Sequence, residues 1–389
     1  MLKDFKRIFH IAAWNRNIGD WTMGYNTHRM LERAAASRGI GLSFYMIDSQ
    51  RSEFHDALIE QINDEASLFL IGGGGMVFNR PQDESASGWA FNIPEAKLAS
   101  ITAPMFVFAI GYNKFYFDEA KWPDYMGEHL RTLQDLATYF SVRDVGSKVQ
   151  LVSKFGLDEE GIEVVPDPGM RHFDRHIEIP EIAKAGDGPL IGINWAGDRP
   201  EERFAHPWRE TRRYFVRELT KCVRRLIEEK NARVLFIPHL EDVDVDFFRE
   251  LREEIASSNL FSLYNLMGHL YPPAGEILYH HIPFFTNVYR QLDLTIGMRG
   301  HSCIFSFGAG TKFIPFGSHK KVGYFMEEIG GPDYSIKMID PGREDAGTMY
   351  DTIVACLGDE RYARLIDDER QAQFDRLDAV SNKMLDCLR

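Results

Sequence analysis

The chain has 389 residues, enough for roughly two to three domains at about 150 residues each. Hydrophobic residues make up 44% of it and charged residues 26%, a composition that excludes a disordered or fibrous protein. Acidic side chains number 58 against 45 for Lys plus Arg, and the net charge of −13 argues against a nucleic-acid partner or adhesion to anionic lipid. Any anionic ligand must therefore meet basic residues that the fold gathers locally.

The four cysteines, at positions 222, 303, 356 and 387, show no paired spacing, which predicts neither a disulfide framework nor a CxxC metal site. We therefore expect a reducing, cytoplasmic setting. No run approaches the ~18 consecutive apolar residues of a membrane-spanning helix, so we expect no membrane insertion. The short apolar run at 8–14 is interrupted by His10 and lacks a cleavage site, which favours a first strand over a signal peptide.

Short apolar runs alternate with helical periodicity through the first half of the chain. Strands are expected at 8–14, 42–47, 68–71, 105–110, 138–142 and 162–165, and helices at 22–37 and 54–62. Because right-handed crossovers between parallel strands need an intervening helix, this order predicts a parallel sheet with helices on both faces. The first half is thus predicted to be a Rossmann-like α/β domain.

A segment rich in Pro and Gly, at 177–189, has the composition of an interdomain connection. The alternation then restarts, with strands expected at 190–195, 233–237, 292–296 and 312–316 and helices at 211–229 and 244–255. The charged, helically periodic tail at 348–388 predicts helices packed across the surface. We predict two Rossmann-like domains, 1–178 and 179–389, facing a central cleft where the carboxyl ends of their strands bind ligands.

The end of the first strand leads through Asn17, Gly19 and Asp20 into a helix expected to begin near Trp21 or Thr22. Such a turn offers free backbone N–H groups and the positive end of a helix dipole to an anion or a sugar hydroxyl. The alternative is that Asp20 caps the helix while Gly19 makes the turn, and for this motif alone we favour it.

Four consecutive glycines at 72–75 follow the third strand. They fit neither GxGxxG with a trailing acid nor GxxxxGK[ST], which excludes a standard dinucleotide site and a P-loop. A tight turn explains part of the run, but four glycines give more freedom than a turn needs. We therefore interpret Gly73 and Gly74 as part of a wall that faces a ligand.

Arg143 ends another strand with Asp144 beside it. Two interpretations are equally supported. One is an ordinary surface ion pair, and the other is an arginine whose fork binds a carboxylate or a phosphate.

The segment at 295–302 gives the strongest local signal, because a strand of the second domain runs there into the start of a helix. Arg299 offers a bidentate grip on an anion, Gly300 lets the backbone approach closely, and His301 exchanges protons near neutral pH. A single His is usually structural, but this combination at a strand end in the cleft favours function.

Basic residues and histidines also follow other strands of the second domain. Lys320 and Lys321 open the helix after the strand at 312–316, where an anionic ligand would relieve their opposition to the helix dipole. His239 ends the strand at 233–237, and a hydrogen-bonded loop histidine is the favoured interpretation. The acidic run at 241–246 is expected to cap and solvate a helix. The adjacent pair at 280 and 281 does not share one face of an element, so we predict no metal site.

Taken in order, these elements resemble the polysaccharide pyruvyl transferase family. The matching residues are Asn17, Gly19 and Asp20, the glycines at 72–75, the run at 141–144, Asp167 with Pro168, Pro238 with His239, the run Gly297-Met298-Arg299-x-His301, and Lys320. The resemblance covers both domains and leaves out the C-terminal helices. This chain has Gly300 where the family commonly has Leu.

The resemblance implies a GT-B-like architecture and transfer of the enolpyruvyl group of phosphoenolpyruvate to sugar hydroxyls as a cyclic ketal. It implies that Arg299 and His301 grip the donor and supply acid/base chemistry, with Arg143, Lys320 and His239 on the donor side. The loops at Asn17, Gly19, Asp20, Gly73 and Gly74 would face the acceptor. No cofactor or metal is implied.

Two other functions remain open at this point. One is a GT-B glycosyltransferase that uses a nucleotide sugar, because fold does not fix function. The other is a non-catalytic sugar-binding or scaffold protein of polysaccharide assembly. The expected partners are phosphoenolpyruvate and a sugar or lipid-linked glycan, and a lipid-linked acceptor would bring the protein to the cytoplasmic face of the membrane. The sequence defines neither the acceptor sugar nor the oligomeric state.

Overall fold

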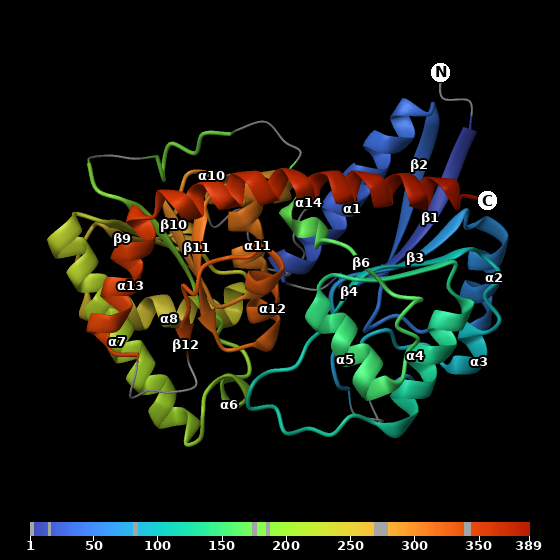
Figure 1. Cartoon of the computed structure of the whole chain (residues 1–389), viewed down its shortest axis with the longest axis horizontal. Helices are drawn as coiled ribbons and strands as arrows, with labels where there is room; N and C mark the ends of the chain where they lie inside the picture. The colour runs from blue at the N-terminus through green and yellow to red at the C-terminus, as the bar shows by residue number, and fades with distance from the viewer. Residues whose placement is uncertain are drawn as a thin grey trace.

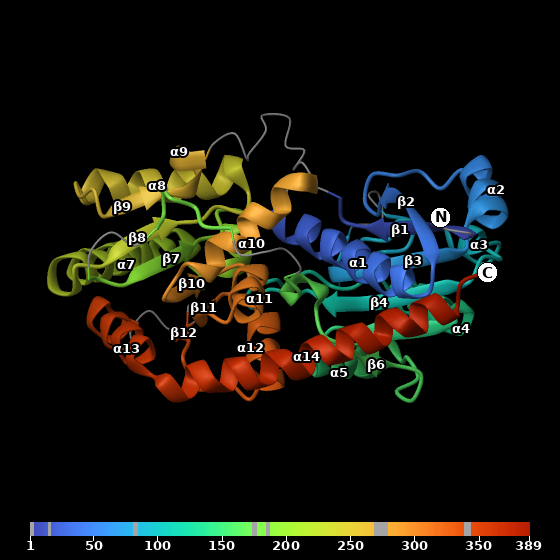
Figure 2. The same cartoon turned by 90° about the horizontal axis from the view of Figure 1, so that it is seen from above.

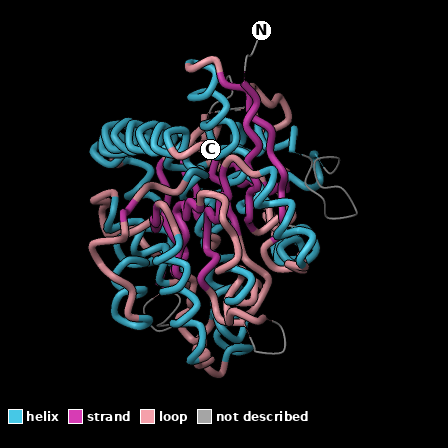
Figure 3. The backbone as a smooth tube through the Cα atoms, turned by 90° about the vertical axis from the view of Figure 1, so that its right-hand side faces the viewer, coloured by secondary structure: helices cyan, strands magenta, loops and turns pink. Residues whose placement is uncertain are grey.

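The structure is a computed structural model and describes residues 4–14, 17–80, 85–172, 177–183, 187–267, 279–337 and 344–389. Its elements form two α/β domains side by side, the first drawn in blue to green and the second in green to orange (Figure 1). Helices lie on both sides of the strands when the molecule is viewed from the side of the first domain (Figure 3).

The first domain contains a six-stranded sheet in the order β2-β1-β3-β4-β5-β6, with every neighbouring pair parallel. Its strands are β1 (Asp4–Ala12), β2 (Ile40–Asp48), β3 (Leu68–Val77), β4 (Met105–Tyr112), β5 (Tyr139–Val142) and β6 (Glu163–Val164). Its helices are α1 (Ile18–Ser37), α2 (Asp56–Glu65), α3 (Glu95–Leu98), α4 (Asp124–Leu136), α5 (Val145–Phe155) and the 3-10 turn η1 (Pro168–Met170).

The second domain repeats this plan with the strand order β12-β11-β10-β7-β8-β9, again all parallel. Its strands are β7 (Leu190–Asn194), β8 (Arg233–Phe236), β9 (Leu260–Ser262), β10 (Leu294–Gly297), β11 (Lys312–Gly317) and β12 (Ile336–Lys337). Its helices are α6 (Pro200–Arg203), α7 (Trp208–Lys230), α8 (Glu241–Glu254), α9 (Leu263–Met267), η3 (Tyr279–His281), α10 (Ile282–Arg290), α11 (Gly300–Ala309), α12 (Lys320–Glu328), α13 (Ala346–Gly358) and α14 (Glu360–Asp386).

The predicted fold class, two Rossmann-like parallel-sheet domains, is confirmed. Central strands are apolar throughout because helices cover both faces of the sheet, and all eight residues of β4 are buried. The strands β9 and β12 were not predicted, since runs of three and two residues are too short to show a period.

The last helix joins the two domains. Tyr362, near the start of α14, donates a hydrogen bond to the carbonyl of Phe313 in the second domain. Near its other end, Lys383 pairs with Glu163 and Asp386 pairs with Arg38, both in the first domain. Figure 2 shows the red helix running along both domains. Part of the predicted connection at 177–189 lies outside the described residues, and its described residues Ile179 and Ile182 are buried.

Candidate active site between the two domains

A cavity of about 320 Å³ lies between the domains, at the carboxyl ends of β1, β3, β7, β10 and β11. The first domain lines it with Ala13, Asn17, Asp20, Gln50, Arg51, Gly73, Gly75, Met76, Phe78, Asn113 and Phe115. The second domain contributes Asp198, Arg199, Arg203, Leu240, Arg299, His301 and Lys321. This is the edge at which parallel α/β sheets bind ligands.

The start of α1 forms one wall of the cavity. Asn17 is the N-cap, because its side chain accepts a hydrogen bond from the backbone N–H of Gly19 at 2.9 Å. The expectation that Asp20 caps a helix beginning near Trp21 was therefore wrong, since Asn17 already supplies a capping oxygen three positions earlier. Asp20 lies in the first turn and lines the cavity.

The glycine run serves packing as well as the cavity. Gly72, Gly73 and Gly74 have φ values of +129°, +90° and +83°, which L side chains rarely adopt. Gly73 lines the cavity together with Gly75, whereas a Cβ at Gly74 would meet the side chain of Met23 at 2.9 Å. The run thus places backbone against the cavity, but Gly74 itself is not among the lining residues.

Arg143 and His301 both lie close to Asp167, the buried residue that caps the N-terminus of η1. Its Oδ2 lies 3.3 Å from Nη1 of Arg143 and 3.6 Å from Nε2 of His301, and its Oδ1 accepts the N–H of Gly169 at 2.8 Å. Burial alone would raise the pKa of Asp167, but His301 and Arg143 outweigh it and lower the pKa to about 2. The carboxylate is therefore ionised and fixes both basic side chains.

Arg143 is buried, so the interpretation as an ordinary surface pair does not apply to it. Its Nε lies 3.4 Å from Asp144, and its Nη2 is buried without a hydrogen-bond partner among the described residues. The Nε2 atom of His301 is also buried and makes no hydrogen bond to a described residue. Among the described residues, Nη2 of Arg143 therefore remains a buried donor without a partner, and Nε2 of His301 has only the carboxylate of Asp167 nearby, at 3.6 Å.

Arg299 donates hydrogen bonds to carboxylates of the protein itself. Its Nε and Nη2 donate to the two oxygens of Asp244 at 2.9 and 2.6 Å, and Nη2 also reaches Asp198 at 2.7 Å. These carboxylates overcome the effect of burial and raise the pKa of Arg299. From the sequence, the guanidinium of Arg299 was expected to bind an anionic ligand through two donors. In the structure these donors bind Asp244 and Asp198 instead, so that expectation is corrected. Arg299 still lines the cavity as a fixed cation.

The lysine that reaches the cavity is Lys321, whereas Lys320 is exposed and lines neither of the two cavities at this site. Adjacent residues of a helix point about 100° apart, so only one of the two can face the cleft. Lys321 donates to Oδ1 of Asn113 at 3.2 Å, across the domain boundary. Burial, followed by the charges of Arg143 and Arg203, lowers the pKa of Lys321 to about 7.

His239 is a structural histidine in this fold. Its Nε2 lies 2.7 Å from the hydroxyl of Tyr289, and its carbonyl accepts the N–H of Ile18 at 3.2 Å. It is buried and absent from the cavity lining, in agreement with the favoured interpretation of a hydrogen-bonded loop histidine. The resemblance implied a position for His239 on the donor side, but the structure does not bring His239 to the cavity.

Asp198 and Arg203 were not singled out from the sequence, and Asp244 was considered only as a member of the acidic run. Asp244 is fully buried and accepts a hydrogen bond from Arg299. The acidic run had been expected only to cap and solvate a helix, so Asp244 has a role that was not predicted. Asp198 pairs with both Arg299 and Arg203. The one available signal was position, because Asp198 and Arg203 follow shortly after the strand predicted at 190–195.

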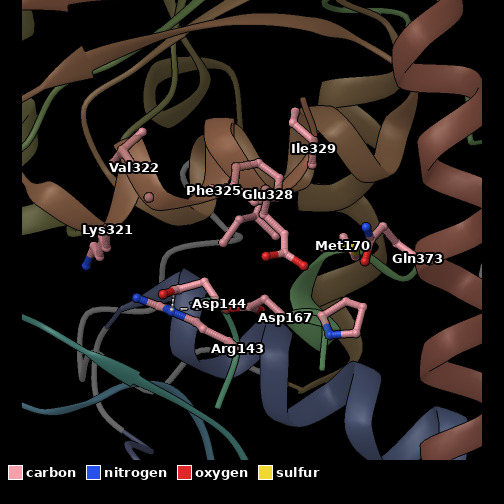
Figure 4. A pocket seen from close by; sticks show the side chains of 13 residues that line it. Arg143, Asp144, Asp167, Met170, Lys321, Val322, Phe325, Glu328, Ile329 and Gln373 are labelled. Carbon is pink, nitrogen blue, oxygen red and sulfur yellow. Dashed lines mark hydrogen bonds and ion pairs between the residues drawn. The ribbon is translucent and has the colours of Figure 1, made fainter. Parts of the chain in front are cut away.

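A second, much smaller cavity of about 20 Å³ lies behind this cluster and shares Lys321 with the first. Figure 4 shows Arg143, Asp144 and Asp167 on one side of it and Phe325 and Glu328 on the other. Gly300 also lines it, and a Cβ there would lie 3.1 Å from Cε of Lys321. A larger residue at position 300 would therefore press on Lys321.

Within the described ranges, no three His, Cys, Asp or Glu side chains gather closely enough to hold a metal ion. No helix in the part of the chain that the structure describes combines the length and apolar character that a bilayer span requires.

Similar solved structures share the fold. The chain aligns with a UDP-GlcNAc 2-epimerase from Neisseria meningitidis bound to UDP-GlcNAc at a TM-score of 0.57 and 10% identity, covering 98% of this chain and 99% of that one. A glycosyltransferase from Rickettsia africae aligns at 0.58 and 11%, with 98% of each chain covered. A complex of MnaA from S. aureus with UDP aligns at 0.55 and 13%, covering 94% and 90%. At such identities the similarity establishes the GT-B-like fold alone.

The sequence comparisons complement this result. No curated protein sequence matches the chain significantly. The profile described as "Polysaccharide pyruvyl transferase" matches residues 3–320, which include every residue of the cavity lining except Lys321. The chain belongs to the polysaccharide pyruvyl transferase family.

Proposed function

We propose that this transferase moves the enolpyruvyl group of phosphoenolpyruvate onto two hydroxyls of a sugar, forming a pyruvate ketal. The observation that carries the proposal is the buried Nη2 of Arg143, which has no hydrogen-bond partner among the described residues, near Nε2 of His301 and the side chain of Lys321. An unmade hydrogen bond at a buried donor is unfavourable by about 1–3 kcal/mol, so such donors normally have a partner. A small polyanion at this place would supply one.

Phosphoenolpyruvate has the required chemistry. Its carboxylate and phosphate lie on adjacent atoms, so a protein of net charge −13 needs several local cations to bind it. Arg143 and Lys321 would contact these charges, and Arg299 would add the positive field of a guanidinium that Asp244 and Asp198 hold in place.

His301 is positioned for proton transfer. As an imidazolium it would protonate the methylene carbon of the donor, making C2 electrophilic, and a sugar hydroxyl would then attack C2 and return its proton to His301. The C2–O bond to phosphate breaks next. The second hydroxyl attacks C2 and closes the ketal, and its proton leaves with the phosphate. Asp167 would orient the ring from 3.6 Å.

The space in front of this cluster suits a sugar. The cavity of about 320 Å³ is larger than a three-carbon donor, and its first-domain wall includes the start of α1 and the glycine run. Asp20 and Asn113 present polar groups there that would bind sugar hydroxyls.

Thermal unfolding with phosphoenolpyruvate, and separately with UDP-sugars, tests the proposal. A ligand at ~100 times its Kd adds about 2.7 kcal/mol of stability. We expect phosphoenolpyruvate to stabilise the wild type and Lys320→Met, but not Lys321→Met, and to release inorganic phosphate when sugar acceptors are supplied. Stabilisation by a UDP-sugar alone would replace the proposal with nucleotide-sugar transfer. A chain that responds to no donor would favour a non-catalytic sugar-binding protein.

A further inference from the structure

The geometry points to a second anion site in the same cavity, formed by Arg51 and Arg199, which binds a negatively charged group carried by the acceptor. The preferred acceptor is accordingly a sugar with a phosphate or a carboxylate of its own, not a neutral sugar. This inference rests on the proposed function and extends it from the donor to the acceptor.

The charges of the cavity lining are unbalanced. Five basic side chains line it, Arg51, Arg199, Arg203, Arg299 and Lys321, against the two carboxylates Asp20 and Asp198. Two of the cations are neutralised within the protein: Arg203 lies on both oxygens of Asp198 at 3.0 and 3.2 Å, and Arg299 lies on Asp244. Lys321 belongs to the donor cluster. Arg51 and Arg199 therefore remain without a role in donor binding.

Arg51 belongs to the turn that follows β2. Asp48 fixes this turn by accepting the backbone N–H groups of Gln50 and Arg51 at 2.8 and 3.0 Å. The guanidinium of Arg51 has no hydrogen bond or ion pair with any residue that the structure describes. The backbone of the turn is thus ordered, while the charge that it carries into the cavity is unused.

Arg199 approaches from the opposite domain. Its guanidinium lies 5.9 and 5.8 Å from the ring centres of Phe78 and Phe115, which belong to the first domain. Its ion pair with Glu202 uses one oxygen at 3.3 Å, and nearly half of its side chain is exposed, at 47%. Cation–π contacts orient a guanidinium without neutralising it. Arg199 is therefore a positioned cation that still has donors for an anion.

Both arginines are separate from the residues proposed to bind the donor. Neither contacts Asp167, His301 or Asp244, which hold the donor-side residues. An acceptor between them and the glycine run would present its hydroxyls toward His301 and its charge toward Arg51 and Arg199. A neutral acceptor would offer no counter-charge to either of these two cations of the cavity lining.

Calorimetric titration with inorganic diphosphate tests this site directly. We expect the wild type to bind diphosphate at two sites, one lost in Lys321→Met and the other weakened about ten-fold by each of Arg51→Gln and Arg199→Gln. The double variant should lose the second site and still be stabilised by phosphoenolpyruvate. Arg249→Gln, which removes a 71%-exposed arginine of α8, is the matched control and should keep both sites.

Binding of glucose 1-phosphate, glucuronate and glucose is then compared, which shows whether a phosphate or a carboxylate on the acceptor sugar is preferred. We expect either charged sugar to bind more tightly than glucose in the wild type, and this preference to vanish in the double variant. A wild type that binds diphosphate only at the Lys321-dependent site, or a double variant that keeps both sites, would overturn the inference. Absence of phosphoenolpyruvate binding would instead refute the proposed function, and the diphosphate titration would still decide the Arg51–Arg199 site.

Discussion

Gly19 and His301 face each other across the interdomain cleft, so closely that a Cβ on Gly19 would lie 2.6 Å from Cγ of His301 and nearer still to Nδ1. The first turn of α1 in one domain therefore fixes one side of the His301 ring, while Asp167 fixes the other. The position of the proposed proton donor depends on both domains at once.

Gly19→Ala is expected to lower kcat by about ten-fold or more, because the added methyl group must push the ring away from Asp167 or shift α1. Overpacking of this kind destabilises by roughly 1–3 kcal/mol, so Tm should fall as well. Gly323→Ala is the matched control: a Cβ there meets nothing within 4 Å, and this residue of α12 should accept it with unchanged turnover. Equal kcat values for the two variants would refute a positioning role for Gly19.

Donor binding should depend on pH through Lys321. With its pKa near 7, the ammonium loses its proton as the pH rises through neutrality, and a neutral amine attracts phosphoenolpyruvate less. Above about pH 7 the affinity should therefore fall by up to about ten-fold per pH unit. Measured Kd values for phosphoenolpyruvate between pH 6 and 9 test this expectation. Lys321→Met should bind weakly without the step, and Lys320→Met should retain it.

The buried clamp on Arg299 should be essential for stability. Asp244→Ala leaves a buried guanidinium with Asp198 as its remaining partner and frees the backbone N–H groups of His239 and Leu240, which Asp244 also accepts. Breaking a buried pair from one side destabilises by about 3–5 kcal/mol, and we expect that loss in urea denaturation. Asp246→Ala removes a 63%-exposed acid from the same helix and should change stability by less than about 1 kcal/mol.

The sequence was sufficient to predict the layers of the fold because strands such as β4 are apolar from end to end. Of the twelve strands in the described residues, the edge strands β9 and β12 were missed, whereas the two-residue edge strand β6 was predicted within the run at 162–165. Of the residues singled out at the strand ends, Asp20 and His301 line the larger cavity and Arg143 lines the smaller one beside it. Such residues combine unusual chemistry with a recognisable position in the chain.

The partners of those residues could not be predicted. Whether Lys320 or Lys321 faces the cleft depends on the rotation of α12, and both lysines suit the start of a helix after a strand. Asp244 sits in an acidic run that resembles a solvated helix start, and only the tertiary structure brings it under Arg299. Sequence reasoning therefore assigned Arg299 a free fork that three carboxylate contacts occupy.

Acid should destabilise the folded chain before its carboxylates titrate. Burial lowers the pKa of His10 and of His129 to about 4, so the folded state takes up these protons only near that pH, whereas the unfolded chain does so near 6.5. Between pH 6.5 and 4 the unfolded state binds more protons, and stability falls by at most about 3 kcal/mol per histidine. Urea denaturation at several pH values should show this slope, and a flat profile in that window would contradict it.

Tyr279 ends a buried hydrogen-bond chain that links the second domain to the glycine run. The carbonyl of Gly72 can only accept, so Nε2 of His10 donates to it at 2.9 Å, and neutral His10 must then accept at Nδ1 from Nε2 of His28, also at 2.9 Å. His28 in turn accepts the hydroxyl of Tyr279 at 2.9 Å.

Tyr279→Phe leaves the buried Nδ1 of His28 without its donor. We therefore expect a loss of about 1–3 kcal/mol in the free energy of unfolding, together with faster amide exchange at the interdomain start of α1. Tyr45→Phe removes a hydroxyl from a tyrosine that is 44% exposed, and it serves as the control with a change near zero. If the two variants proved equally stable, the chain of hydrogen bonds would have no energetic role. A selective loss in Tyr279→Phe would mean that the contact between the domains also holds the carbonyl of Gly72, and with it the wall of the cavity.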